Sequence, residues 1–217
     1  MNKAFLTTKL TPVIAIIICY AFYLTENFQI IFAALIALIA SAIEYKKDLF
    51  KSLGFQSEKI NLKSLLIYAP ILAVVIFLCY GYVMIPSVTY LTGEPMDFSE
   101  FKQFKGNLSA SLGLLAYIWI SAAFGEEIVF RGYLMRQFTK FFGASTISLA
   151  INILLLGFLF GFIHSYQGVS GQIITGIIGM LLAVIFHIRK NDLWFNVALH
   201  GCIDTIAVVY IYNGWAL

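Results

Sequence analysis

The sequence predicts an all-α membrane protein, a bundle of about seven transmembrane helices with one short helix at the membrane surface. Two observations carry this prediction. Apolar side chains make up 61% of the 217 residues and charged side chains only 12%, whereas soluble domains contain about 45–50% and about 25%. The apolar residues also gather in runs close to the ~20 residues that a spanning helix needs. Lipid is therefore the expected surroundings of most of the chain.

Seven apolar runs follow one another along the chain. The first two are short and are joined by the tight link at 25–27, which predicts a tilted hairpin. Lys3 and Lys9 before the first run are also compatible with a signal peptide, but no small-residue cleavage site follows, so we expect an uncleaved first helix. The runs lie at about residues 10–24, 28–43, 65–85, 108–128, 146–164, 172–188 and 193–212.

The basic residues predict the orientation, because cytoplasmic connections carry an excess of Lys and Arg. All of the 14 basic residues except Lys102 and Lys105 lie in the N-terminal segment or follow every second run. This pattern predicts a cytoplasmic N-terminus and an outer C-terminus.

The connection at 86–107 is longer than the others. Phe98, Phe101 and Phe104 recur there every three residues, after a capping candidate at Asp97 or Ser99. The spacing predicts a short amphipathic helix on the membrane surface, with an ordinary loop that buries some phenylalanines as the alternative. Without an internal repeat or a linker, residues 1–217 are expected to form a single membrane domain.

Two classes of site are not indicated. No basic stretch is interleaved with aromatic residues, so no nucleic-acid partner is expected. Cys19, Cys79 and Cys202 are far apart and form no CxxC motif, so we expect neither a disulfide framework nor a thiolate zinc site. The expected partners are the lipid bilayer and a membrane-anchored peptide or protein substrate. The pattern leaves the oligomeric state open.

Charged and titratable residues inside the runs are the functional candidates, because a charge in the bilayer is costly and is usually functional. Six such residues stand out: Glu126, Glu127, Arg131, His164, His200 and Asp204.

The first group is the segment Gly125–Arg131. On a helix, Glu127 and Arg131 are four residues apart and can pair, while Glu126 points about 100° away from Glu127. We therefore expect Arg131 to hold Glu127 and to leave Glu126 free as a general base in a desolvated place. The alternative is a charged helix end that snorkels to the interface.

The second and third groups supply imidazoles. His164 ends a long apolar run, where a structural histidine is the alternative. His200 and Asp204 share a helix face, and an aspartate there can orient an imidazole or help to bind water, an oxyanion or a metal. A polar pair that holds two helices together is the alternative. Taken together, the groups can form a water-activating site.

Three motifs occur in order: Glu-Glu-x-x-x-Arg at 126–131, Phe-x-x-x-His at 160–164 and His-x-x-x-Asp at 200–204. They resemble the motifs of the CPBP family, the CAAX-protease and bacteriocin-processing intramembrane proteases, also called the Abi family. The resemblance covers about residues 105–210. It implies an all-helical membrane endopeptidase, with residues 105–212 as its catalytic helical core.

The resemblance also implies roles for the residues. Glu126 would be the base, and His164 would help it to activate water. His200 and Asp204 would stabilise the oxyanion or complete the site, with Glu127 and Arg131 in support. The family's third motif often ends in Asn, whereas Asp204 donates a hydrogen bond only when it is protonated.

No cofactor is favoured by the pattern. If a divalent metal such as zinc were used, His164, His200, Asp204 and Glu126 would be its ligands. The family resemblance allows three substrates: prenylated tails, peptide precursors and C-terminal membrane anchors. A bacterial or archaeal plasma membrane is the expected location. The alternatives are a proton- or ion-coupled transporter and a non-catalytic membrane scaffold or immunity protein.

One geometric condition applies to this site. Counted along straight helices, Glu126, His164 and His200 do not fall at one depth. Helix tilt, or a break near Gly157 and Gly161, must bring them together.

Overall fold

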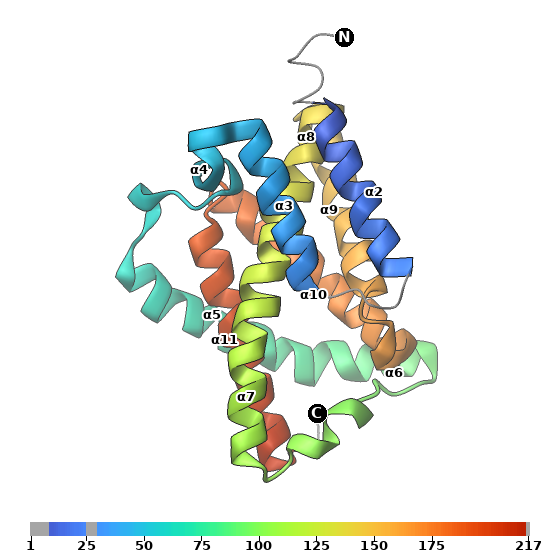
Figure 1. Ribbon diagram of the computed structural model, residues 1–217. Helices are drawn as coiled ribbons and strands as arrows, with labels where there is room; N and C mark the ends of the chain where they lie inside the picture. The colour runs from blue at the N-terminus through green and yellow to red at the C-terminus, as the bar shows by residue number, and fades with distance from the viewer. Residues whose placement is uncertain (1–8, 25–29, 216–217) are drawn as a thin grey trace.

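The computed structural model describes residues 9–24 and 30–215, and its regular elements are all helical (Figure 1). The all-α prediction is therefore confirmed for this part of the chain. The link at 25–27 lies outside the described residues. The α-helices are α2 (Thr11–Leu24), α3 (Ile30–Tyr45), α4 (Leu49–Leu53), α5 (Ala69–Cys79), α6 (Ile85–Thr92), α7 (Leu108–Ile118), α8 (Met135–Phe142), α9 (Thr146–Phe162), α10 (Gly168–Ile188) and α11 (Leu193–Asn213).

Shorter helical stretches complete or connect these elements. The π-helical stretches η4, η5 and η7 join α-helices into longer rods, whereas the 3₁₀ stretches lie in connections. Their bounds are η2 (Lys46–Asp48), η3 (Ser57–Lys59), η4 (Ser64–Tyr68), η5 (Tyr80–Met84), η6 (Ser99–Phe104), η7 (Trp119–Leu134) and η8 (Ser165–Gln167).

Each of the seven predicted runs coincides with a helix. In residues 9–24 and 30–215, four helices are long and apolar enough to cross a membrane: Ser64–Thr92, Leu108–Phe142, Ser165–Ile188 and Leu193–Asn213. The stretches Thr11–Ala21 and Thr146–Phe162 are apolar but shorter. The helix Ser64–Thr92 runs across the direction of α7 and α9 in Figure 1. Crossing by all seven helices stays a prediction.

The fourth run is longer than predicted. The helix does not end at 128 but continues to Phe142, and its middle, η7, is π-helical. The backbone N–H of Met135 accordingly bonds the carbonyl of Phe130, five residues back. π-Helical turns are rare and often mark functional sites. The two glutamates thus lie in the middle of a long helix, with Glu127 fully buried, so the alternative of a snorkelling helix end is excluded.

The predicted surface helix is a short 3₁₀ helix, η6. The side chain of Asp97 accepts a hydrogen bond from the backbone N–H of Ser99 at 2.7 Å, and hydrogen bonds from Ser99 hold the pKa of this carboxyl below its usual range. Residues three apart share one face of a 3₁₀ helix. Here Phe98 and Phe101 line a cavity of the protein. The rings of these two residues therefore form part of a cavity wall and do not serve only as contacts to lipid.

Helices α9 and α10 pack tightly against each other through glycines. A Cβ at Gly161 would collide with the backbone oxygen of Gln172, and one at Gly157 would collide with the side chain of Met180. Small residues that let backbones approach are typical of helix pairs in membranes. Helix α9 runs unbroken through both glycines. Of the two alternatives, tilt or a break near Gly157 and Gly161, the break is therefore not found, and the glycines serve close packing.

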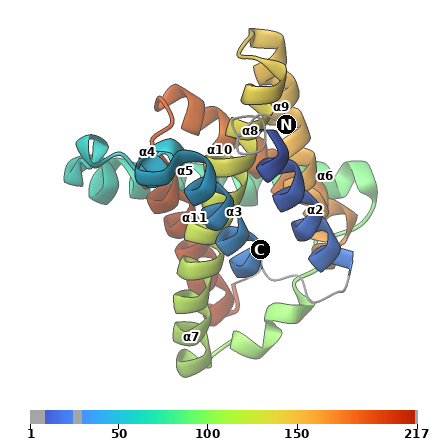
Figure 2. The same cartoon turned by 45° about the horizontal axis from the view of Figure 1, so that its top comes forward.

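The predicted cytoplasmic connections converge at one end of the bundle. The ammonium of Lys59 donates to the carbonyl of Lys190, the N–H of Leu193 donates to the carbonyl of Gly54, and Lys140 pairs with Glu44. Figure 1 places α4, α8 and the first turn of α2 at this end, and the start of α7 and the end of α11 at the other. Figure 2 shows α3 lying across the yellow-green η7 segment, as it does in Figure 1, and the two elements are in contact.

Replacing Gly161 by Ala is expected to lower the free energy of unfolding by about 1–3 kcal/mol, because the methyl group forces α9 and α10 apart. The matched control is Gly113→Ala in α7, where a Cβ meets nothing within 4 Å. Alanine favours a helix over glycine, so the control should be neutral or slightly stabilising. Thermal unfolding of the purified protein in detergent measures both, and equal midpoints for the two variants would contradict the packing argument.

Candidate active site

Two helical elements carry most of the predicted site. Segment η7 holds Glu126, Glu127 and Arg131, and α11 packs beside it with His200 and Asp204. Their close approach depends on a residue without a side chain.

That residue is Gly201, where a Cβ would lie 2.6 Å from the ring of Trp119. The ring nitrogen of Trp119 also donates a hydrogen bond to the hydroxyl of Thr205 at 3.1 Å. The indole therefore sets the spacing between η7 and α11.

Glu127 is the centre of a buried polar cluster. One carboxylate oxygen accepts from the guanidinium of Arg131 at 2.8 Å and lies 2.9 Å from Nδ1 of His200. The other oxygen accepts from the amide of Asn196 at 3.1 Å. Arg131 also donates to the carbonyl of Gly179 at 2.7 Å. A buried charge is costly unless it is paired and hydrogen-bonded, and this cluster meets that requirement for both ions.

His200 lies between the two neighbouring glutamates. A carboxylate only accepts, so Nδ1 carries a hydrogen and donates it to Glu127, which leaves Nε2 to face the other way. Nε2 lies 3.8 Å from Glu126 and 3.6 Å from Asp204. Glu127 therefore fixes the orientation of the imidazole, and Glu126 and Asp204 border its reactive nitrogen.

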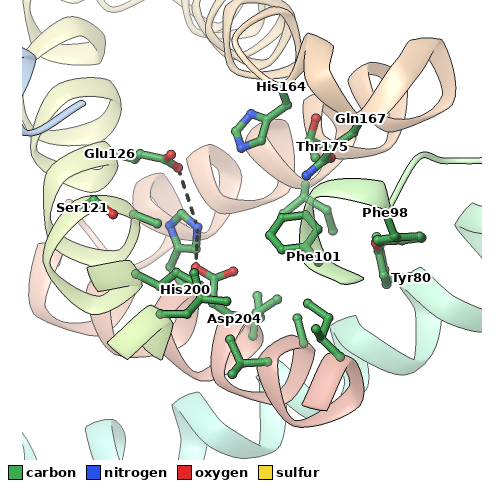
Figure 3. A pocket seen from close by; sticks show the side chains of 18 of the residues that line it. Tyr80, Phe98, Phe101, Ser121, Glu126, His164, Gln167, Thr175, His200 and Asp204 are labelled. Carbon is green, nitrogen blue, oxygen red and sulfur yellow. Dashed lines mark ion pairs between the residues drawn. The ribbon is translucent and has the colours of Figure 1, made fainter. Parts of the chain in front are cut away.

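Glu126 differs from Glu127 in its partners. Its side chain is buried, yet its Oε2 atom has no hydrogen-bond partner in the described part of the chain. Figure 3 shows this carboxylate directed toward His200 from the opposite helix. It is the free carboxylate that the sequence predicts beside an Arg131–Glu127 pair.

His164 approaches from a third element. It lies directly after α9, and its Nδ1 is 2.7 Å from the carbonyl of Phe160. A carbonyl only accepts, so Nδ1 carries the hydrogen and Nε2 is left with a lone pair. In Figure 3 the imidazole projects into the space opposite His200 and Asp204.

These side chains border one cavity of about 330 Å³. Glu126, His164, His200 and Asp204 all line it, so the structure brings the four predicted catalytic residues together. Glu127 and Arg131 lie behind them and do not line it. Most of the remaining wall is apolar or aromatic, including Phe77, Tyr80, Phe98, Phe101, Tyr117, Ile178 and Ile211.

Counted along straight helices, Glu126, His164 and His200 would lie at different depths. The end of α9 and the packing of η7 against α11 bring them to one cavity. Helix α9 stops at Phe162, and the backbone then turns so that His164 points back across the cavity. The spacing of η7 and α11 places His200 level with Glu126. No break inside α9 is needed.

Sequence reasoning missed Asn196, which holds both Glu127 and the carbonyl of Leu182. The signal was present, because Asn196, His200 and Asp204 recur every fourth residue and so share one face of α11. It also missed Trp119, Tyr166 and Gln167. Tyr166 and Gln167 line the cavity but occur in a turn without any periodic pattern.

The predicted metal alternative does not fit the donor set well. Within residues 9–24 and 30–215, no three His, Cys, Asp or Glu side chains are arranged to hold a metal ion.

A family model described as "Type II CAAX prenyl endopeptidase Rce1-like" matches residues 108–206. The match covers 99 of the 217 residues. The matched region includes η7, His164 and the segment of α11 that carries His200 and Asp204. The resemblance predicted from the three motifs is therefore confirmed. Neither a curated protein nor a solved structure matches the chain.

The match of residues 108–206 to the Rce1-like family implies a protease with a peptide or protein substrate. Together with the four helices that can cross a membrane, it implies an integral membrane protein. The roles of the individual site residues stay predictions.

Removing Arg131 should destabilise the protein strongly, because it leaves the buried carboxylate of Glu127 without its cation. Breaking one partner of a buried pair costs about 3–5 kcal/mol. We expect Arg131→Met to lose folded yield and stability, measured by size-exclusion recovery and thermal unfolding in detergent.

The double variant Arg131→Met/Glu127→Gln tests the cause. It buries no unpaired charge and should recover part of the lost stability. A double variant less stable than Arg131→Met alone would show that the loss does not come from the stranded carboxylate.

Proposed function

We propose that this protein is an intramembrane endopeptidase in which Glu126 activates the attacking water. The observation that carries the proposal is the state of Glu126. Its carboxylate is buried and free of hydrogen bonds at Oε2, and it borders a cavity beside Nε2 of His200. A general base needs a free carboxylate within reach of a water molecule and of the bond to be broken.

In the proposed reaction, Glu126 takes a proton from water as the water oxygen bonds to the carbonyl carbon of the substrate. The carbonyl electron pair moves onto its oxygen, giving a tetrahedral intermediate with an oxyanion. When this intermediate collapses, the carbon–nitrogen bond breaks, and the proton held by Glu126 passes to the leaving amine. One carboxylate thus serves as base and then as acid.

His200 suits the oxyanion side of this reaction. In its protonated form, Nε2–H donates into the cavity, and the imidazolium is stabilised by the hydrogen bond from Nδ1–H to Glu127. Hydrogen-bond donors fixed toward a developing negative charge are a large part of catalysis in such sites. Asp204 in its protonated form would supply a second donor on the same side.

His164 suits the water side. Its Nδ1–H is bound to the carbonyl of Phe160, so the lone pair on Nε2 can accept the second hydrogen of the water. The two imidazoles would then have different tasks: His164 orients the nucleophile and His200 receives the oxyanion.

The cavity wall supports a substrate with apolar segments at the bilayer. Prenylated tails, peptide precursors and C-terminal membrane anchors all present such a segment close to a peptide bond. We propose residues 105–212 as the catalytic core within a single membrane domain, because every proposed catalytic side chain comes from it.

Glu126→Gln is expected to lower peptide cleavage by at least a hundredfold, since general-base catalysis contributes about 10²–10⁴-fold. The protein should keep its fold, because the Glu127 cluster is intact. The assay uses purified protein and a library of membrane-tethered peptides. The matched control is Glu58→Gln, the same carboxylate-to-carboxamide change at an exposed residue that does not line the cavity. His164→Ala and His200→Ala should also abolish cleavage.

The same samples test the alternatives. Cleavage that survives in Glu126→Gln would remove this residue from the mechanism. Loss of activity on chelation, with one bound zinc in the active protein, would keep the protease and replace the glutamate mechanism. Ion or solute flux through liposomes without any cleavage would favour a transporter. A cellular function that Glu126→Gln retains in full would favour a non-catalytic scaffold.

We propose that the chain crosses the membrane seven times, with its N-terminus in the cytoplasm and its C-terminus outside. The support is the convergence of the basic connections at one end of the bundle, as the excess of Lys and Arg in cytoplasmic connections requires. The catalytic cavity is bordered by Phe98 and Phe101 in the connection at the other end.

Single cysteines test this orientation in a chain whose three native cysteines are replaced by alanine. We expect Gln103→Cys to react with a membrane-impermeant maleimide on intact cells, and Ser57→Cys to react only after permeabilisation. Both positions are exposed and uncharged, so the comparison is matched. The reverse labelling pattern would place the cavity mouth in the cytoplasm.

A further inference from the structure

A second cavity, of about 480 Å³, lies at the basic end of the bundle. It is formed by the end of α3, helix α8, the turn before α9 and the end of α10. It is separate from the catalytic cavity, since the two share no lining residue. None of the proposed catalytic side chains borders it.

Cationic groups dominate the polar part of this second cavity. Arg131, Arg136 and Lys140 line it, together with His187. No Asp or Glu is among its lining residues. The carboxylate of Glu44, next to the lining residue Tyr45 in sequence, is bound by Lys140 and by the amide of Gln137.

Arg136 differs from the other two strong cations in its partners, because only the charges of Tyr45 and Glu44, within the described part of the chain, act on it. Arg131 is paired with Glu127, and Lys140 with Glu44. The guanidinium of Arg136 is partly buried, and among the described residues no hydrogen bond or ion pair is made to it. A partly desolvated guanidinium presents five donors in a planar fork that matches a phosphate.

The remaining wall suggests which kind of anion fits. Met135, Leu149 and Phe186 are apolar, whereas Tyr45 and Asn191 add polar groups. An amphipathic anion, with a charged headgroup and an apolar chain, can contact both the basic and the apolar residues of this wall. Basic pockets between transmembrane helices on the cytoplasmic side bind the head groups of anionic lipids.

We propose that this cavity binds the phosphate of an anionic phospholipid headgroup, with Arg136 as the main ligand and Lys140 beside it. The proposal concerns binding and does not depend on proteolysis. The bound phosphate would lie next to Arg131, on the opposite side of that residue from the catalytic cavity. The same chemistry could be supplied by a free phosphate, and the experiment separates the two sources.

The test uses full-length protein in detergent, titrated with phosphatidylglycerol and followed by native mass spectrometry. Wild type should retain a bound phosphatidylglycerol more strongly than phosphatidylcholine. Arg136→Gln should weaken the binding of phosphatidylglycerol about fivefold, which corresponds to about 1 kcal/mol for one basic residue. The matched control is Lys63→Gln, which removes the same charge from an exposed position outside the cavity and should bind as wild type does.

A second variant guards against misfolding of Arg136→Gln. Ala144 is exposed at the cavity rim, so Ala144→Phe should obstruct the cavity without changing any charge, and it should also lose the preference for phosphatidylglycerol. Unchanged binding by both variants would overturn the proposal. Equal losses in Lys63→Gln and Arg136→Gln would overturn it as well, because they would show a diffuse surface effect.

The source of the phosphate is decided in nanodiscs of phosphatidylcholine alone. A rise in the unfolding temperature of wild type on adding inorganic phosphate, absent in Arg136→Gln, would support the site and assign it to a free phosphate ligand. A rise produced only when phosphatidylglycerol is included would assign it to the lipid.

Discussion

The pairing of the buried carboxylate of Glu127 with Arg131, Asn196 and His200 is the interaction on which the rest of the site depends. A carboxylate removed from water costs several kcal/mol unless it is paired and hydrogen-bonded. Its partners come from η7 itself and from two successive turns of α11. The requirement to satisfy one charge therefore fixes the register of α11 against η7, and with it the position of His200.

Adjacent glutamates take different tasks because of this arrangement. Glu127 has three partners and orients the imidazole from its Nδ1 side, whereas Glu126 has a free oxygen and borders Nε2. A fully satisfied carboxylate cannot serve as a base, and a free one cannot hold two helices together. The sequence pair Glu126–Glu127 supplies one of each, and the helix geometry of η7 lets both reach the same histidine.

Arg131 connects the two cavities of the protein. Its guanidinium holds Glu127 behind the catalytic cavity, and Arg131 is also among the residues that line the second cavity. Close packing at Gly161 holds α9 against α10, and close packing at Gly201 holds α11 against η7. Such packing matters in a membrane, because the hydrophobic effect does not drive one apolar helix against another within lipid.

The sequence by itself determined the all-helical class, the seven apolar runs, the pairing of Glu127 with Arg131 and the four candidate catalytic residues that the structure places around one cavity. These follow from local facts: composition, run length and spacing along a helix. It could not decide that the fourth helix continues to Phe142, that α9 stays unbroken, or that Asn196 and Trp119 support the site. Only the tertiary structure decided these points, because they depend on which helices touch and how closely. They also depend on contacts between residues far apart in the sequence, such as Asn196 with Glu127, 69 positions apart, and Trp119 with Thr205, 86 positions apart.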